Sequence, residues 1–113
     1  MKAQPVIADS SGYAECSVAK ATHVKIKLPG PTGVLVLPVI TSGSRKDTPF
    51  WTWNGDTENP TLRPSLLSKL EWKVPAVICH CFVNDGLVQF LTDSTHSLAG
   101  QTVPLIDLQG SDL

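Results

Sequence analysis

The sequence predicts a mostly β fold: a small single-domain antiparallel sheet, arranged as a sandwich or an open barrel, with one short helix near residues 94–99. Its 113 residues suit one domain, and 42% of them are hydrophobic, which is enough for one core. Nine prolines and eight glycines divide the chain into short pieces, which favours strands and turns over long helices. We therefore expect a flexible N-terminal arm at 1–20, a β domain at 21–108 and a polar tail at 109–113.

The first predicted strands follow the arm. Hydrophobic and polar residues alternate along His23–Leu28, which predicts a half-buried strand. Residues 34–40 are apolar on both faces, as in a central strand, and Pro38 requires a bulge or an edge because it has no amide proton. A third strand is expected at 49–53, after a polar loop at 41–48.

A hairpin is the clearest feature of the second half. Residues 77–83 have a strand pattern, and the sequence NDG at 84–86 is a strong turn signal that leads into a strand at 87–91. The turn has either two or three residues, and the choice sets the residue that lies opposite His80. The other expected elements are a helix or strand at 65–72, a helix near 94–99 capped by Asp93 or Ser94 and ended by Gly100, and a last strand at 103–108.

The composition argues against several classes of protein. The formal net charge is −1 and the basic residues do not cluster, so we expect no sequence-independent binding to nucleic acid. No apolar run reaches the roughly 20 residues that span a membrane. The three cysteines are an odd number in a chain without a recognisable export signal, which predicts reduced thiols in a cytoplasm.

The densest group of reactive side chains is Cys79-His80-Cys81, followed by His96. Side chains alternate along a strand, so Cys79 and Cys81 are expected on one face and His80 on the other. The hairpin returns the chain after residue 91 alongside Cys79 and His80. We therefore expect His80 and His96 to approach each other.

Zinc binding is the first of three interpretations of this group. Thiolate and imidazole are ligands that zinc prefers, so Cys79, His80 and His96 are the candidate metal ligands. A closed structural site needs a fourth protein ligand. The candidates for it are Cys16, His23 and Asp93.

Two other interpretations need no metal. In one, Cys79 or Cys81 is a nucleophile activated by a histidine, with Asp93 as the orienting group. In the other, the two cysteines are small buried hydrophobes and His80 is a hydrogen-bonded core histidine.

A second candidate site lies in the segment between residues 50 and 65. Its aromatic and amide side chains could form a platform for a ligand or peptide, although indoles on a strand also serve to fill a core. Arg63 stands in an apolar segment fixed by prolines and would prefer an anionic partner, with Asp56 or Glu58 nearby in sequence. The candidate binding residues are Trp51, Trp53, Asn59, Thr61 and Arg63.

Four segments resemble a family of phage and prophage proteins of unknown function, whose members are often labelled "ammonia monooxygenase" and which is similar to the DUF6527 group. The resemblance covers roughly residues 49–105, and it implies that Cys79-His80, His96 with the residues at 99–101, and the segment 60–65 belong to the family pattern. Wider relatives carry further upstream cysteines that suggest zinc. The matching segments are 51–55 (WTWNG), 59–66 (NPTLRPSL), 79–86 (CHCFVNDG) and 89–103 (QFLTDSTHSLAGQTV).

A phage origin implies a function by binding. Small phage proteins without an obvious catalytic set commonly bind a host protein, including components of host defence. We therefore expect a phage-encoded accessory protein in the host cytoplasm that binds a host protein and holds a structural zinc. The alternative is a small metal- or thiol-dependent hydrolase that uses Cys79, His80 and His96. The sequence leaves the oligomeric state open.

Overall fold

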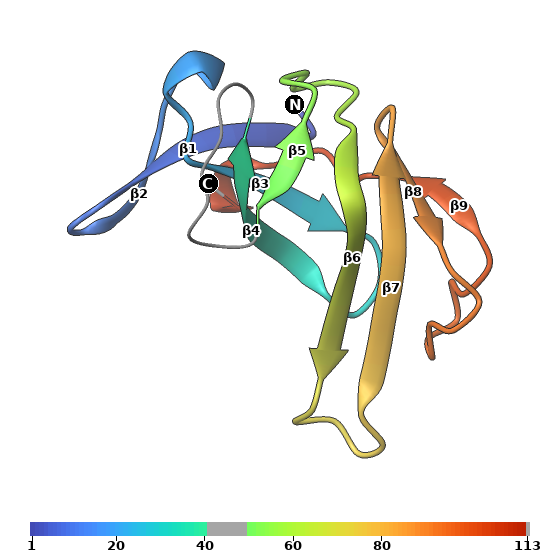
Figure 1. Cartoon of the computed structure of the whole chain (residues 1–113). Helices are drawn as coiled ribbons and strands as arrows, with labels where there is room; N and C mark the ends of the chain where they lie inside the picture. The colour runs from blue at the N-terminus through green and yellow to red at the C-terminus, as the bar shows by residue number, and fades with distance from the viewer. Residues whose placement is uncertain (41–49, 113) are drawn as a thin grey trace.

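The protein is mostly β, as the sequence predicts. The computed structural model describes residues 1–40 and 50–112, so the predicted loop at 41–48 and the first residue of the predicted strand at 49–53 lie outside the described residues. Within the described ranges, no helix is long and apolar enough to cross a membrane. The described elements (Figure 1) are β1 (Ala3–Asp9), β2 (Gly12–Glu15), the 3-10 turn η1 (Val18–Lys20), β3 (His23–Leu28), β4 (Gly33–Ile40), β5 (Trp51–Trp53), β6 (Leu62–Leu70), β7 (Val77–Asn84), β8 (Leu87–Phe90), β9 (Thr102–Pro104) and the 3-10 turn η2 (Gly110–Asp112).

The strands join one sheet in the order β2-β1-β3-β4-β5-β6-β7-β8-β9. Neighbouring strands are antiparallel, except that β4 and β5 are parallel. In Figure 1 the sheet bends back on itself, so that β6 and β7 run across β3 and β4. The hydrophobic core is built by both halves of the sheet. Its strand residues are Ala3, Val24, Ile26, Leu28, Leu37 and Val39 from β1, β3 and β4, and Trp53, Leu62, Leu66, Cys79, Cys81, Val83, Val88 and Phe90 from β5 to β8.

The first 20 residues supply the strands β1 and β2 of the sheet and the turn η1, which corrects the expectation of a separate arm. β1 lies between β2 and β3, Ala3 is fully buried and Val6 is 2% exposed. The amide of Ala3 donates a hydrogen bond to the carbonyl oxygen of Thr57 at 3.0 Å. Small and polar side chains such as Ala3 and Gln4 occupy buried positions of β1. The strand therefore lacks the run of large hydrophobic residues by which sequence patterns reveal a strand.

The helix expected at 94–99 is also corrected, because this segment forms turns instead. The amide of Ala99 donates to the carbonyl oxygen of His96 at 3.2 Å, and the amide of Gln101 donates to that of Leu98 at 2.9 Å. Each of these bonds closes a single turn. The second of these turns ends at Gln101, directly before β9.

Three further segments complete the comparison. The segment at 65–72 is strand as far as the end of β6, because it pairs with β7 along its length. The last strand, expected at 103–108, is the shorter β9. The polar tail folds back on the sheet through η2, where Lys27 Nζ donates to Asp112 Oδ1 at 3.1 Å.

The hairpin between β7 and β8 has a two-residue turn. Asp85 and Gly86 both have positive φ, 52° and 78°, and Asn84 pairs directly with Leu87. Positive φ at both central residues is typical of the turns that connect twisted antiparallel strands. The two-residue turn brings Leu91 opposite His80. The amide of Leu91 donates a hydrogen bond to the His80 carbonyl oxygen at 2.8 Å, which confirms this register.

Replacing Gly86 tests how tightly the turn packs. A Cβ at this position would lie 3.3 Å from the Cα of Asn59, whereas a Cβ at Gly33, where φ is also positive, would have no neighbour within 4 Å. We expect Gly33→Ala to lower the free energy of unfolding by about 1–2 kcal/mol, the cost of positive φ for a residue with a side chain. Gly86→Ala should cost more, because backbone must also move. Urea denaturation of both variants measures the difference, and equal losses would contradict the close packing at Asn59.

Candidate active site

The strands β6 and β7 have two different faces. Directly opposite residues of an antiparallel pair carry their side chains on the same face, so Leu67 shares a face with His80, and Ser68 shares the other with Cys79. The face of Cys79 is the core, where this residue is 1% exposed, whereas Leu67 is 67% exposed. We call the face that carries Leu67 and His80 the outer face of β6 and β7. The predicted separation of Cys79 from His80 is confirmed.

Ser65 and His80 meet on the outer face. Ser65 stands two residues before Leu67, which makes it a diagonal neighbour of His80, within reach of a long side chain. Ser65 Oγ lies 3.0 Å from His80 Nε2. The register between the strands shifts between Leu62 and Leu66, and such irregularities re-aim the side chains near them. The bulge thus lies at the position of the serine.

Asp93 binds the other nitrogen of the His80 ring. Its Oδ2 lies 2.9 Å and its Oδ1 3.2 Å from His80 Nδ1. A carboxylate only accepts hydrogen bonds, so Nδ1 carries the proton and the lone pair of Nε2 faces the Ser65 hydroxyl, which donates to it. The side chains of His80 and Asp93 are 25% and 61% exposed. Because water screens this pair, the main effect of Asp93 is to fix the tautomer and orientation of the ring.

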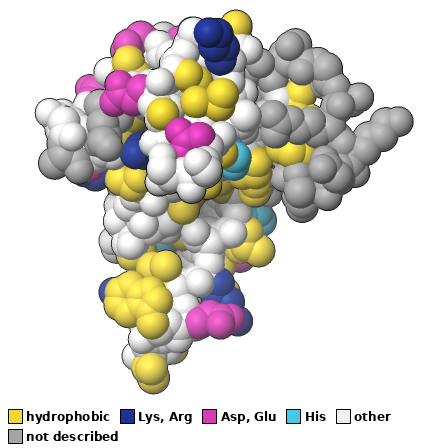
Figure 2. All heavy atoms as spheres, turned by 90° about the vertical axis from the view of Figure 1, so that its left-hand side faces the viewer, with side chains coloured by type: hydrophobic (Ala, Val, Ile, Leu, Met, Phe, Trp, Pro, Cys, Tyr) yellow, Lys and Arg dark blue, Asp and Glu magenta, His cyan; other side chains and the backbone are white. Residues whose placement is uncertain are grey.

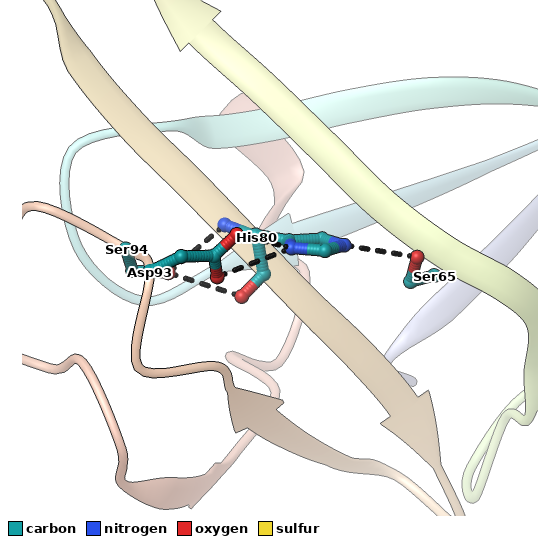
Figure 3. A network of polar contacts seen from close by, with 4 residues as sticks. All are labelled: Ser65, His80, Asp93 and Ser94. Carbon is teal, nitrogen blue, oxygen red and sulfur yellow. Dashed lines mark hydrogen bonds and ion pairs between the residues drawn. The ribbon is translucent and has the colours of Figure 1, made fainter.

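Ser94 holds the backbone of His80 in place (Figure 3). Its hydroxyl accepts a hydrogen bond from the His80 amide and donates one to the His80 carbonyl oxygen, both at 3.0 Å. Ser94 is 6% exposed, so water does not replace these bonds readily. Next to it, Thr95 Oγ1 accepts a hydrogen bond from the amide of Ile78 at 2.8 Å. The segment that carries Asp93 is therefore tied to β7 at His80 and at Ile78.

The two cysteines occupy the core side of β7 and are 1% and 0% exposed. A hydrogen bond between their thiols lowers the pKa of Cys79 and raises that of Cys81, and burial raises the pKa of Cys81 further. The nearby side chains of Thr32 and His96 lower the pKa of Cys79 as well. Burial keeps both thiols away from any substrate that approaches the outer face.

His96 is a half-buried residue beside Cys79 rather than a neighbour of Ser65 and Asp93. Its ring packs edge-on against Phe90 with 4.8 Å between the ring centroids. Its Nδ1 accepts a hydrogen bond from the amide of Leu98 at 3.2 Å, which leaves the proton on the buried Nε2. The expected approach of His80 to His96 is not seen, because His80 is engaged by Ser65 and Asp93 on the outer face.

The side chains predicted to share a zinc ion are therefore divided between two faces. Cys79 and His96 lie on the core side, and both ring nitrogens of His80 are hydrogen-bonded on the outer side. Among residues 1–40 and 50–112, no group of three or more His, Cys, Asp or Glu side chains is placed to hold a metal ion. The candidates for a fourth ligand do not complete such a group: Cys16 follows β2, His23 lies on β3 and Asp93 binds His80. These donors do not fit a zinc site.

The five candidate binding residues do not form one exposed platform. Trp53 is 2% exposed and its Nε1 donates to the carbonyl oxygen of Asp56 at 3.3 Å. Trp51 packs partly against the core, and its Nε1 donates to the Ser65 carbonyl oxygen at 3.3 Å. The indoles therefore have structural roles, and Trp51 also anchors the backbone of the serine.

The three polar candidates stabilise the loop before β6 and the hairpin turn. The carbonyl oxygen of Asn59 accepts a hydrogen bond from Asn54 Nδ2 at 3.2 Å, and Thr61 Oγ1 accepts one from the amide of Asp85 at 2.9 Å. Arg63 donates to Asn84 Oδ1 at 2.7 Å and to two backbone carbonyl oxygens, and it stacks over the ring of a neighbouring phenylalanine. Its partners are thus neutral oxygens rather than the expected Asp56 or Glu58.

Ser65 is a candidate site residue that the sequence analysis does not single out. It stood in the family segment 60–65 without an assigned role. Its relation to His80 depends on the register between β6 and β7, and the segment at 65–72 was ambiguous between helix and strand. The nucleophile–histidine–Asp93 interpretation came closest, since it joined a histidine to Asp93, but it placed a cysteine where the structure places a serine.

Fold and site together define a small β-sheet protein that carries a hydrogen-bonded Ser–His–Asp trio on its outer face, the side-chain set that serine hydrolases use. The chain belongs to the BubE family, described as bacterial ubiquitination-like system serine protease, whose model matches residues 28–91. Ser65 and His80 lie within the matched residues and Asp93 lies just after them. No curated protein and no solved structure matches the chain. These results do not test the resemblance to the phage family, which stays a prediction.

Replacing Ser94 tests how His80 is held. Ser94→Ala leaves the part-buried amide of His80 without its partner, which should lower the free energy of unfolding by about 1–3 kcal/mol. Thr95→Val is the matched control, because Thr95 is exposed and water can take over its bond to Ile78. Urea denaturation of both variants measures the contrast. An Ser94→Ala variant as stable as the Thr95→Val variant would contradict the proposed support.

Proposed function

We propose that this protein is a serine protease of a bacterial ubiquitination-like system, with Ser65 as nucleophile, His80 as general base and acid, and Asp93 as the residue that orients His80. The observation that carries the proposal is the continuous hydrogen bonding from Ser65 Oγ through both nitrogens of His80 to Asp93. The family description supports the reaction class and the biological system.

Acylation follows from this geometry. The Ser65 hydroxyl transfers its proton to His80 Nε2 while Oγ attacks the carbonyl carbon of an amide bond in the substrate. The carbon–nitrogen bond then breaks, and the imidazolium of His80 returns the proton to the leaving amine. Asp93 stabilises the imidazolium between these transfers and stays ionised. The product of this half-reaction is an ester between the substrate's acyl group and Ser65.

Deacylation uses the same groups with water as the nucleophile. Nε2 of His80 takes a proton from water, the hydroxide attacks the ester carbonyl, and Ser65 leaves with that proton restored. The net reaction is hydrolysis of an amide to a carboxylic acid and an amine. It needs no metal or redox cofactor for its balance.

Two features favour this proposal over the alternatives from the sequence. A thiol-dependent hydrolase would need an accessible cysteine, whereas Cys79 and Cys81 are buried on the opposite face from His80. A protein that only binds a partner has no need for an arrangement in which Asp93 fixes the His80 tautomer so that Nε2 accepts the Ser65 proton. The expected role as a phage accessory protein with a host partner stays a prediction, since no contact described above bears on it.

Labelling with a fluorophosphonate tests the nucleophile directly. These reagents phosphonylate a serine that is activated by a histidine, and they need no substrate recognition. We expect the native protein to react at Ser65, and Ser65→Ala to lose the reaction. Ser68→Ala is the matched control, since Ser68 lies on the same strand but shares a face with Cys79. Mass mapping locates the label, and an unlabelled native protein or a label elsewhere would sink the proposal.

Replacing Asp93 tests the orienting role. Asp93→Asn keeps the size of the side chain but no longer favours the tautomer in which Nε2 accepts the Ser65 proton. We expect the labelling rate to fall by roughly 10²–10⁴-fold, the range that general base catalysis contributes. Asp85→Asn, in the hairpin turn, should keep the native rate. Labelling of Asp93→Asn at the native rate would remove Asp93 from the mechanism.

A further inference from the structure

Among residues 1–40 and 50–112, no strand covers one edge of β6 beside the proposed nucleophile, and we call this the open edge. On one side, β6 pairs with β7 over residues 66–70. On the other side, β5 pairs only with Leu62 and Arg63, so within the described residues no strand covers the edge beyond them. In Figure 1 the β6–β7 hairpin extends away from the rest of the molecule beyond this point.

The ladder shows which backbone groups face the open edge. The carbonyl oxygens of Ile78 and His80 accept hydrogen bonds from the segment after β8, so they point away from β6. In an antiparallel ladder, opposite residues either exchange hydrogen bonds or both point outward. The residues opposite Ile78 and His80 are Lys69 and Leu67. Their N–H and C=O groups therefore face the open edge, and no described residue hydrogen-bonds to them.

The open edge leads directly to Ser65. Leu67 is two residues away from the serine, roughly 7 Å along an extended strand. At Ser65 itself the edge is closed, because Trp51 Nε1 occupies the Ser65 carbonyl oxygen. A strand that pairs with Lys69 and Leu67 must therefore leave the plane of the sheet as it reaches Ser65. The backbone carbonyls of the added strand then lie beside the Ser65 hydroxyl and do not continue the hydrogen-bonded ladder.

We propose that the substrate is an extended polypeptide segment that adds to this edge as an antiparallel strand, hydrogen-bonded to Leu67 and Lys69. The proposal rests on the proposed function and adds its mode of recognition. Edge addition is a recurrent way to bind extended peptides, and antiparallel pairing is the more stable arrangement. The unpaired edge ends at Leu67, two residues from the serine, so a strand bound to it brings its next residues to Ser65.

The direction of the strand determines which part of the substrate is recognised. An antiparallel strand passes Lys69 first, then Leu67 and then Ser65. The residues on the N-terminal side of the scissile bond therefore lie along the edge, and these residues form the acyl group. If the residue opposite Ser65 provides the attacked carbonyl, the third and fifth residues before the scissile bond pair with Leu67 and Lys69.

Exposed hydrophobic side chains add a preference at one of these positions. The side chain of Leu67 is 67% exposed on the outer face, and a residue paired with it places its side chain on the same face. We therefore expect an apolar third residue before the scissile bond. Figure 2 shows further hydrophobic side chains gathered at the end of the hairpin, where Trp72 and Val74 are 75% and 98% exposed.

The test begins with a synthetic mixture of randomised peptides and the native protein. Mass spectrometry identifies the cleaved sequences and their scissile bonds. We expect cleavage of members with an apolar third residue before the bond. If no peptide is cleaved while Ser65 still reacts with a fluorophosphonate, extended polypeptide recognition is overturned and the serine hydrolase chemistry stands. If Ser65 does not react either, the proposed function itself fails.

Backbone methylation of the best cleaved peptide tests the pairing. A methyl group on an amide nitrogen removes the donor and blocks a close strand. We expect methylation at the third and fifth residues before the bond to reduce kcat/KM by about tenfold or more, equivalent to one hydrogen bond of about 1.4 kcal/mol. Methylation at the second and fourth should have little effect. A loss without this alternation would overturn the edge pairing.

A pair of protein variants tests the same edge from the other side. Leu67→Pro removes an amide that faces the open edge and leaves the bonds to β7 intact, while Leu67→Ala keeps the amide and removes only the side chain. We expect both to react with the fluorophosphonate like the native protein, which also reports that the site has folded. Leu67→Pro should lose peptide cleavage by about tenfold or more beyond Leu67→Ala. Equal cleavage by the two variants would contradict the proposal.

Discussion

Along β7 every second side chain is buried, and this alternation holds the core and the site together. Cys79, Cys81 and Val83 face the core, whereas His80 faces outward between them. A slip of one residue in the pairing with β6 would bury the imidazole and expose the thiols. The hydrophobic packing of the buried residues therefore also fixes the position of the proposed base. Stability and chemistry depend on the same register.

The outer face is completed by side chains that replace missing backbone partners. β8 pairs with β7 from Asn84 to Cys81, and beyond that point Ser94 and Thr95 bond the backbone of β7 with their hydroxyls. On the opposite side, Trp51 bonds the backbone at Ser65. Ser65 and His80 are thus each held by a contact outside the trio. The carboxylate of Asp93 is the most exposed member, so its position relies on the anchored residue that follows it.

Much of the framework could be predicted from the sequence, because alternating patterns and turn residues are local. The strands at His23–Leu28 and after residue 77, and the turn at Asp85-Gly86, are examples. β1 could not be recognised, since Ala3 and Gln4 fill buried positions that usually hold large hydrophobic side chains. Its place in the sheet depends on pairing with β2 and β3 on its two sides.

The site could be predicted only in part for the same reason. His80 and Asp93 were identified because histidine beside the hairpin and an acidic residue after it lie in one local motif. Ser65 could not be assigned, because a bulge in β6 decides which residue meets His80, and a bulge leaves no clear mark in the sequence. His96 was drawn into the predicted zinc site by proximity in sequence. Its neighbours in the core, Cys79 and Phe90, explain its position.

The sequence separations within the trio have a consequence for how the protein folds and evolves. Ser65 lies 15 residues before His80, and Asp93 lies 13 residues after it, so one contiguous stretch carries all three side chains. Short loops close at a small cost in chain entropy, and local contacts form early during folding. The strands β1, β3 and β4 contribute six of the fifteen buried residues of the core but none of these side chains. One continuous segment, from β6 to Asp93, therefore carries all three side chains of the trio. The rest of the scaffold can change in sequence without altering these three residues.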